Sequence, residues 1–298
     1  MTTSGRNDYA AFRRALRRVA PKISRPLPWI GHESAWAVLV SEVMLQQTQT
    51  SRVIEPWTRF MARFPTARSC ADASLAEVLG AWRGLGYHRR AKSLHDTARV
   101  LRDEFGGAVP SGVKALRSLP GVGEYTAAAV ASFAFGEHVA VLDTNVGRVL
   151  ARALANRRLR PSEARALAAD VLPRTDAATF NQAMLDLGAQ FCRSTPRCGE
   201  CPVLAHCAWR QSGGDDPAPL SAGVSRAQPR FEGSNRQLRG RVLNALRDGP
   251  RSREELDTVL DGADRVRGDV VLEGLERDGL ITRRTRTYVL AGASSPTL

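Results

Sequence analysis

Apolar residues recur at helical spacing from about residue 33 to residue 210. Segments 74–82, 91–104, 124–135 and 162–172 are rich in Ala, Leu and Arg, and Pro or Gly separates one segment from the next. Strand-like alternation of apolar and polar residues is scarce over the same stretch. The pattern predicts a mainly α-helical domain of roughly ten helices.

One predicted helix, residues 35–45, is apolar on nearly every side and is expected at the centre of a hydrophobic core. Glu42 is the one acidic residue in it. Burial disfavours a charged carboxylate, so we expect the pKa of Glu42 to be raised. A carboxyl group that stays protonated near neutral pH can act as a general acid. The alternative is a buried Glu that is held by a structural partner.

A second pattern follows residues 211–233, which are rich in Gly, Pro, Ser and Asp and which we interpret as a linker. Beyond the linker, the apolar spacing predicts three short helices and a two-stranded ribbon over 280–284 and 287–290. Three helices and a hairpin in so short a stretch are typical of a winged helix. The predicted organisation is a helical domain over 1–210, the linker, and a winged-helix-like domain with a C-terminal tail over 234–298.

The charge of the chain is strongly positive, because 43 Lys and Arg residues face 30 Asp and Glu residues, a formal net charge of +13. This balance favours nucleic acid or an anionic membrane surface as a partner over simple solubility charge. No apolar stretch is long enough to span a membrane, and no apolar core follows the basic N-terminus as it would in a secretory signal. The basic face of the predicted N-terminal helix either contacts phosphates or is solvated, and its residues are Arg13, Arg14, Arg17 and Arg18.

Four of the five cysteines lie in one short segment and have the spacing C-x5-C-x2-C-x5-C. Four thiolates in a single loop can surround one compact centre, whereas zinc ribbons usually use two separated knuckles. The spacing therefore favours a [4Fe–4S] cluster over zinc, in a cytoplasmic protein rather than in one held by disulfides. The four residues are Cys192, Cys198, Cys201 and Cys207.

The sequence Leu-Pro-Gly-Val-Gly at 119–123 lies between two predicted helices. Its two glycines allow backbone conformations and close approaches that other residues avoid. The N–H groups at the start of the second helix could then bind a phosphate, and an ordinary tight turn is the alternative. Asp143 precedes another predicted helix and is a favoured N-cap, a role that does not exclude catalysis.

This ordered series of motifs is similar to the helix-hairpin-helix DNA glycosylases, which include endonuclease III, and within them it most resembles the MutY-type adenine glycosylases. The resemblance covers about residues 25–210 and rests on SEVMLQQTQT (41–50), GLGYHRRAKSL (84–94), LPGVGEYTAAAVASFAFG (119–136), LDTNVGRVLAR (142–152) and FNQAMLDLGAQFC (180–192). It implies a mainly α helix-hairpin-helix glycosylase fold with a [4Fe–4S] loop over 192–207. It also implies a monomeric, cytoplasmic and nucleoid-associated enzyme of base excision repair, acting on double-stranded DNA in which adenine lies opposite 8-oxoguanine or guanine.

The resemblance also implies a role for individual residues. Glu42 would protonate the adenine ring, and Asp143 would stabilise the positive charge that develops on the sugar, with Asn145 close by. The adenine pocket would be lined by Trp29, Leu45 and Gln182. The residues that would contact DNA are Gln47 and Tyr87, which would wedge into the base stack, and the hairpin residues Pro120, Gly121, Val122 and Gly123, which would grip the backbone beside the lesion.

The residue at position 125 separates branches of this family. Members that also cleave the strand have a Lys there, whose amine attacks the sugar. Tyr125 cannot form a Schiff base, so we expect hydrolysis of the glycosidic bond alone. Tyr also occurs here in a related thymine-mismatch branch, so a thymine or pyrimidine-lesion glycosylase is one alternative, and a non-catalytic iron–sulfur DNA-binding regulator is another. SEVMLQQTQ and Gln182 favour adenine, and a regulator has no need for Glu42.

Three features depart from the family pattern. The first cysteine gap is one residue shorter than is usual, and Ile30 follows Trp29 where many members have Arg. Residues 211–298 replace the Nudix-like domain with which most relatives help to read 8-oxoguanine. Residues 236–286 contain 12 Arg and 10 Asp plus Glu, so this module is expected either to contact DNA or to bind a protein partner, without a part in the chemistry.

Overall fold

The computed structural model describes residues 4–222, 230–261 and 263–293. The chain forms two compact units, and each unit combines separated stretches of sequence. Unit 1 comprises Met1–Glu33, Ser111–Arg117 and Gly123–Ala227, and unit 2 comprises Ser34–Pro110, Ser118–Val122 and Gln228–Leu298. No helix in the described ranges is long and apolar enough to cross a membrane.

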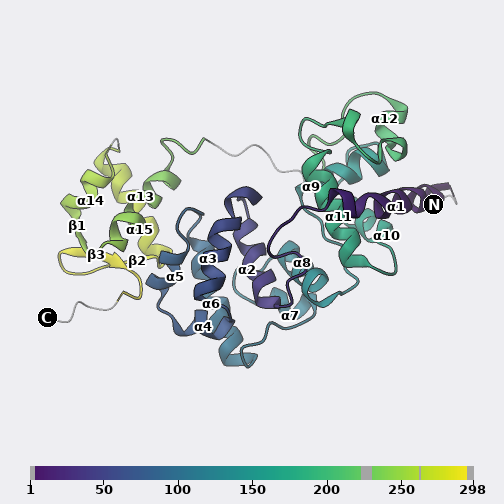
Figure 1. The fold of residues 1–298 in the computed structure, drawn as a ribbon. Coiled ribbons are helices and arrows are strands. Elements are labelled where there is room, and N and C mark those ends of the chain that lie inside the picture. The colour runs from purple at the N-terminus through teal and green to yellow at the C-terminus, as the bar shows by residue number, and fades with distance from the viewer. Residues whose placement is uncertain (1–3, 223–229, 262, 294–298) are drawn as a thin grey trace. The chain divides into compact units, whose positions relative to one another are not determined.

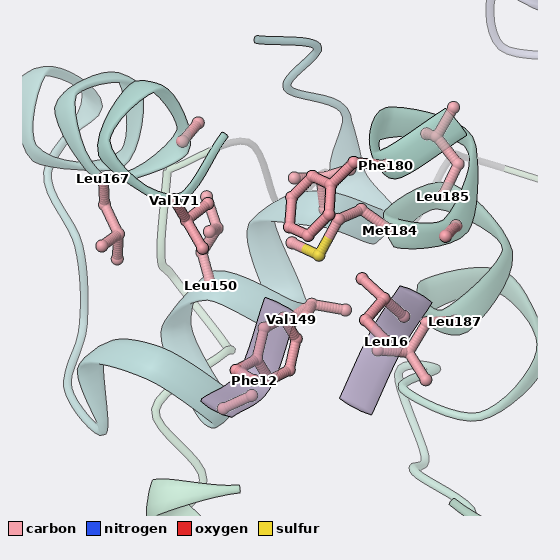
Figure 2. Packing of buried hydrophobic residues seen from close by; sticks show 14 of the residues in the cluster. Phe12, Leu16, Val149, Leu150, Leu167, Val171, Phe180, Met184, Leu185 and Leu187 are labelled. Carbon is pink, nitrogen blue, oxygen red and sulfur yellow. The ribbon is translucent and has the colours of Figure 1, made fainter. Parts of the chain in front are cut away.

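Unit 1 is helical throughout its described residues. Its core joins the first helix to the last long one, since Phe12 and Leu16 are fully buried in the same cluster as Leu150, Phe180 and Met184 (Figure 2). The π-helical segment continues α9 without a break. In chain order the elements of unit 1 are α1 (Ser4–Ile23), α7 (Val113–Arg117), α8 (Glu124–Phe135), α9 (Thr144–Val149), the π-helical segment Leu150–Ala155, α10 (Pro161–Val171), α11 (Ala177–Gln190), the 3-10 turns Cys198–Glu200 and Leu204–His206, and α12 (Ala208–Ser212).

Unit 2 is organised around α2 (Ala35–Leu45), in which every residue from 36 to 44 is buried. Ser34 caps this helix by accepting a hydrogen bond from the N–H of Ala37 at 3.4 Å. The indole N–H of Trp57 donates to the carbonyl of Ala37 at 3.0 Å. The other helical elements in the first stretch of unit 2, Ser34–Pro110, are the 3-10 turn Thr50–Arg52, α3 (Ile54–Arg63), α4 (Ala67–Asp72), α5 (Leu75–Ala81) and α6 (Arg89–Glu104).

The C-terminal module, residues 234–293, completes unit 2 with three helices and a small antiparallel sheet (Figure 1). The strand order is β1-β3-β2, with Ser252 paired to Thr287 and Ile281 paired to Leu290. Ser252 also forms a capping box with Glu255 at the start of α14. The elements are α13 (Asn235–Arg247), β1 (Arg251–Ser252), α14 (Arg253–Val259), α15 (Arg265–Arg277), β2 (Ile281–Arg283) and β3 (Thr287–Leu290).

The mainly helical class predicted from the sequence is confirmed, and a small sheet lies near the C-terminus. The sequence did not predict the strand β1, because two residues are too few to produce an alternating pattern of apolar and polar positions. The start of the predicted linker belongs to unit 1: Asp216 forms an ion pair with Arg152 at 2.6 Å, and the backbone N–H of Ala222 donates to the carbonyl of Leu159. Residues 223–229 of that linker lie outside the described residues.

Candidate active site

Glu42 lies within the buried helix α2, as the pattern predicted, and only 4% of its surface is exposed. The neighbouring residues Val40, Val43 and Met44 of the same helix are also buried. Leu45, which is half-buried, ends the helix. The position of Glu42 is therefore fixed by a helix that has no solvent-exposed face.

The chain after α2 and the chain before α6 both adopt left-handed backbone conformations at non-glycine residues. Gln47 has a φ of 57° and is exposed, and Tyr87 has a φ of 47° and is half-buried. Such conformations cost of order 1–3 kcal/mol and persist only where the surroundings impose them. Both residues were predicted to insert into the DNA base stack, and both have a left-handed backbone in a short connection between helices.

Arg90 imposes these two conformations. Its guanidinium donates to the carbonyls of Met44 at 2.7 Å and Gln46 at 2.5 Å, and to that of Gly86 at 3.3 Å. The same group lies 5.2 Å from the centre of the Tyr87 ring. Burial lowers the pKa of Arg90 to about 10, so the guanidinium stays charged at neutral pH. One buried cation therefore links the end of the Glu42 helix to the two loops.

The turn at 119–123 is tight and requires glycine at one position. Gly121 has a φ of +73°, and a Cβ atom there would lie 2.6 Å from the Cβ of Ser93 in α6. The hydroxyl of Thr97, also in α6, donates to the carbonyl of Pro120 at 2.7 Å. Val122 is buried, whereas Gly121 and Gly123 are exposed, and Gly123 is the N-cap of α8. The turn thus presents backbone to solvent while its base is fixed to α6.

Asp143 is the N-cap of α9, and two donors hold its carboxylate. The backbone N–H of Val146 donates to Oδ1 at 2.7 Å, and the side-chain amide of Asn145 donates to Oδ2 at 2.6 Å. Burial raises the pKa of Asp143, while these hydrogen bonds and the charge of Arg148 oppose that change. Asp143 and Asn145 were predicted to lie close together, and the structure places them in direct contact.

Arg148 connects this pair to the start of the cysteine loop. Its Nη2 donates to the side-chain carbonyl of Asn145 at 2.6 Å, and its Nε donates to the backbone carbonyl of Cys192 at 2.7 Å. Gly188 permits this packing, because a Cβ there would lie 2.6 Å from the carbonyl oxygen of Asn145. Asp143, Asn145, Arg148 and the Cys192 backbone therefore form a continuous series of hydrogen bonds within unit 1.

Two residues predicted for the base pocket also lie in unit 1. Trp29 is 7% exposed. Gln182 is half-buried, and its amide donates to Asp186 at 3.1 Å, while Arg25 forms an ion pair with the same carboxylate at 2.6 Å. Asn181 holds the segment that leads to Asp143, since its amide donates to the carbonyl of Val139 at 2.8 Å. Tyr125, the second residue of α8, is half-buried.

The four clustered cysteines lie in a loop that Arg152 supports. Its guanidinium donates to Sγ of Cys192 at 3.4 Å and to the carbonyl of Arg193 at 2.6 Å, and it lies 5.5 Å from the Trp209 ring centre. No group of His, Cys, Asp or Glu is arranged to hold a metal ion among the described residues. Cys192, Cys201 and Cys207 are half-buried against the core of unit 1, and burial raises the pKa of Cys201 to about 11.

The comparisons with known proteins agree with this geometry. Residues 40–174 match the family model of the HhH-GPD superfamily of base excision DNA repair proteins. The adenine DNA glycosylase of Mycolicibacterium smegmatis is 46% identical over 277 residues, which cover 90% of this chain and 92% of that protein. The chain belongs to the adenine DNA glycosylases.

Further similarities support the family assignment and the fold. The adenine DNA glycosylase of Mycobacterium tuberculosis is also 46% identical, over 87% of this chain and 86% of that protein. A thermostable thymine-DNA glycosylase has a solved structure with a TM-score of 0.63 and 26% identity, over 70% of this chain and 98% of that one. The predicted recognition, enzyme class and helix-hairpin-helix fold are thereby confirmed.

The alignment with the M. smegmatis relative extends into the C-terminal module. Because the M. smegmatis alignment leaves only a tenth of the 298 residues uncovered, roughly 30, it must include at least part of residues 234–298. The alignment also covers 92% of that relative, so its length is close to that of this chain.

The catalytic and DNA-contacting residues that the sequence suggested are divided between the two units. Unit 1 contains Trp29, Gly123, Tyr125, Asp143, Asn145, Gln182 and the four cysteines, and unit 2 contains Glu42, Leu45, Gln47, Tyr87, Pro120, Gly121 and Val122. Sequence reasoning missed Arg90 and Arg148, which hold these residues in place. A signal for Arg148 existed, since it lies three residues after Asn145 and so shares its helical face.

Proposed function

We propose that this adenine DNA glycosylase removes adenine paired with 8-oxoguanine or guanine by hydrolysis alone, with Glu42 as the general acid and Asp143 as the stabilising anion. The observation that carries the proposal is the burial of Glu42 in a helix without a solvent-exposed face. A protein that only bound DNA would gain nothing from so costly a carboxyl group.

The target base must leave the stacked duplex before it can react, because its glycosidic bond is inaccessible within the helix. Glu42 then donates its proton to a ring nitrogen of adenine. The bond between that base and the sugar breaks with its electrons going to the base, and the sugar becomes an oxocarbenium-like cation. Water adds to the cation and loses a proton, which leaves an abasic site and free adenine.

Asp143 stabilises the cation through its negative charge. Its two hydrogen bonds, from Val146 and Asn145, fix the carboxylate before the substrate arrives, and a preorganised charge does not have to reorient during the reaction. Arg148 in turn fixes Asn145. One carboxyl group that carries a proton and one that carries a charge supply the two functions that the reaction needs.

Contacts with DNA complete the proposal. The exposed backbone of Gly121 and Gly123 binds a phosphate beside the lesion, since N–H groups at a helix start favour anions. Gln47 and Tyr87 insert into the stack, and Trp29, Leu45 and Gln182 line the pocket for the extruded adenine. Tyr125 has no amine, so strand cleavage through a Schiff base is absent.

A panel of duplexes tests this function. We expect the protein to release adenine from A opposite 8-oxoguanine and A opposite guanine, and to leave T opposite G intact. Abasic sites are revealed by alkali, and strand breaks before alkali report lyase activity. Release of thymine instead would contradict the proposed specificity, and strand cleavage without alkali would contradict the proposed role of Tyr125.

We also propose that Cys192, Cys198, Cys201 and Cys207 hold a [4Fe–4S] cluster. The chemistry of the donor set supports the proposal, because four cysteines lie within residues 192–207 and three of them pack against the core of unit 1, and four thiolates are the usual ligands of this cluster. When bound, the cluster supplies structural order to the loop whose first carbonyl, that of Cys192, accepts from Arg148.

Metal analysis tests the cluster. Protein that is purified without oxygen should contain about four iron atoms per chain, and Cys198→Ser should lower that content. Cys70→Ala is the matched control, because Cys70 is fully buried elsewhere and should leave the iron content unchanged. Stoichiometric zinc in the wild-type protein would contradict the proposal.

The C-terminal module is proposed to be a winged helix that serves DNA affinity or the binding of a protein partner. Its three helices and antiparallel sheet support that assignment. The cations that would neutralise phosphates are Arg283, Arg284 and Arg286 at the ribbon, of which Arg283 and Arg286 are exposed and Arg284 is half-buried. Whether the module folds alone stays a prediction.

A further inference from the structure

The C-terminal module contacts the residue predicted to wedge into DNA. Arg236, at the start of α13, donates from Nη1 to the hydroxyl of Tyr87. The guanidinium carbon of Arg236 lies 5.0 Å from the centre of the Tyr87 ring and 5.2 Å from that of Phe231. Both segments belong to unit 2, although 149 positions separate the two residues in the chain.

Two arginines from different parts of the sequence therefore contact one tyrosine. Arg90 lies 5.2 Å from the ring centre and also bonds to the carbonyl of Gly86, the residue before Tyr87. Arg90 accordingly holds the left-handed backbone of Tyr87, whereas Arg236 holds the hydroxyl end of the side chain. Tyr87 is fixed at both ends before any DNA is present.

Docking of the module does not depend on Arg236 alone. Arg247, at the other end of α13, donates from Nη2 to the carbonyl of Leu79 at 2.7 Å. Asp278, which pairs with Arg239 inside the module at 2.5 Å, also pairs with Arg89 outside the module at 3.6 Å. These contacts attach the module to the rest of unit 2 without Arg236. The contact between Arg236 and the Tyr87 hydroxyl therefore indicates a role other than attachment of the module.

The surroundings of Tyr87 are rich in positive charge. Burial and the charges of Arg247, Arg239 and Arg90 lower the pKa of the neighbouring His88 to about 4. Like charges held close together repel each other unless an anion comes between them. Asp278 neutralises part of this charge through Arg239 and Arg89, and DNA phosphates beside an inserted tyrosine would neutralise more of it.

We propose that Arg236 is a positioning residue for Tyr87, through which the C-terminal module takes part in reading the base pair that contains the target adenine. This inference rests on the proposed function, in which Tyr87 enters the base stack. A side chain that is ordered in advance loses less conformational entropy on insertion. The module thereby supports discrimination of the opposite base without touching the reacting atoms.

Substitution of Arg236 tests the proposal. Arg236→Met keeps a long apolar side chain but removes the hydrogen bond and the cation–π contact, which together correspond to roughly a tenfold change. We expect the single-turnover rate for A opposite 8-oxoguanine, divided by the rate for A opposite guanine, to fall by roughly this factor of ten. Fluorescence of 2-aminopurine next to the mismatch should rise less on binding, because the neighbouring bases are unstacked less. Arg236→Lys should restore both readouts in part.

Two further variants make the test specific. Arg241→Met removes the same charge from α13 at an exposed position that bonds only within the module, and it should behave as wild type. In a Tyr87→Ala background, Arg236→Met should have no additional effect. An equal loss in both backgrounds, or an Arg236→Met protein that matches Arg241→Met, would overturn the inference. A wild-type protein that releases no adenine would instead overturn the proposed function.

Discussion

Glu42→Gln should lower the single-turnover rate of adenine release by about 10²–10⁴-fold, the usual contribution of general acid catalysis. The amide has nearly the shape of the carboxyl group but cannot give up a proton at neutral pH. Because residues 36–44 of α2 are all buried, a near-isosteric change should disturb their packing little. The rate is measured with enzyme in excess over a duplex that contains A opposite 8-oxoguanine.

Binding and folding controls separate this loss from damage to the protein. Glu42→Gln should bind the same duplex with nearly unchanged affinity and should unfold at a similar temperature. Glu55→Gln makes the same chemical change on an exposed side chain of α3, where its ion pair with Arg59 lies in solvent, and should keep the wild-type rate. If Glu42→Gln kept more than roughly a tenth of that rate, the assignment of the acid would be wrong.

Asp143→Asn should reduce adenine release by about 10²–10³-fold, because the amide removes the negative charge that faces the developing cation. The amide oxygen can still accept from the N–H of Val146 and cap α9. It cannot keep both original hydrogen bonds, because one acceptor oxygen becomes a donor beside the amide of Asn145. The expected loss of stability is therefore about 1 kcal/mol.

Asp264→Asn is the matched control for that experiment. Asp264 caps α15 in the same manner, accepting from the backbone N–H of Arg267 at 2.7 Å. We expect Asp264→Asn to share the small change in melting temperature but to keep the wild-type rate of adenine release. Equal rate losses in the two variants would mean that Asp143 acts as a cap and not as a catalytic charge.

The sequence predicted best the features that depend on neighbours in the chain. The helix 35–45 and its buried Glu42 follow from an apolar run that has no polar side. The capping role of Asp143 follows from its place before a helical stretch. The four cysteines share one loop because only 16 residues, 192–207, contain them all. Each of these conclusions needs only the local geometry of the chain.

Contacts between distant residues were beyond such reasoning. Arg89 and Arg90 are identical and adjacent, yet Arg89 is exposed while Arg90 is buried and bonds to carbonyls up to 47 positions away. Nothing in the local pattern distinguishes the two. The contact between Arg236 and Tyr87 depends likewise on how the module docks, which hydrophobic periodicity does not specify. The strand β1 gains its structure from β3 and not from its own two residues.

Unit 1 takes its first helix from the start of the chain and completes its core with residues as late as Ala218, and this has a consequence for biosynthesis. The partners Arg25 and Asp186 are 161 residues apart. At translation rates of about 5–20 residues per second, roughly 8–30 s separate the emergence of the two. During that interval α1 is already outside the ribosome, with Phe12 and Leu16 on its apolar face. The α11 residues that will cover this face have not yet emerged. The nascent chain therefore exposes a helix suited to capture by chaperones until most of the enzyme has been made.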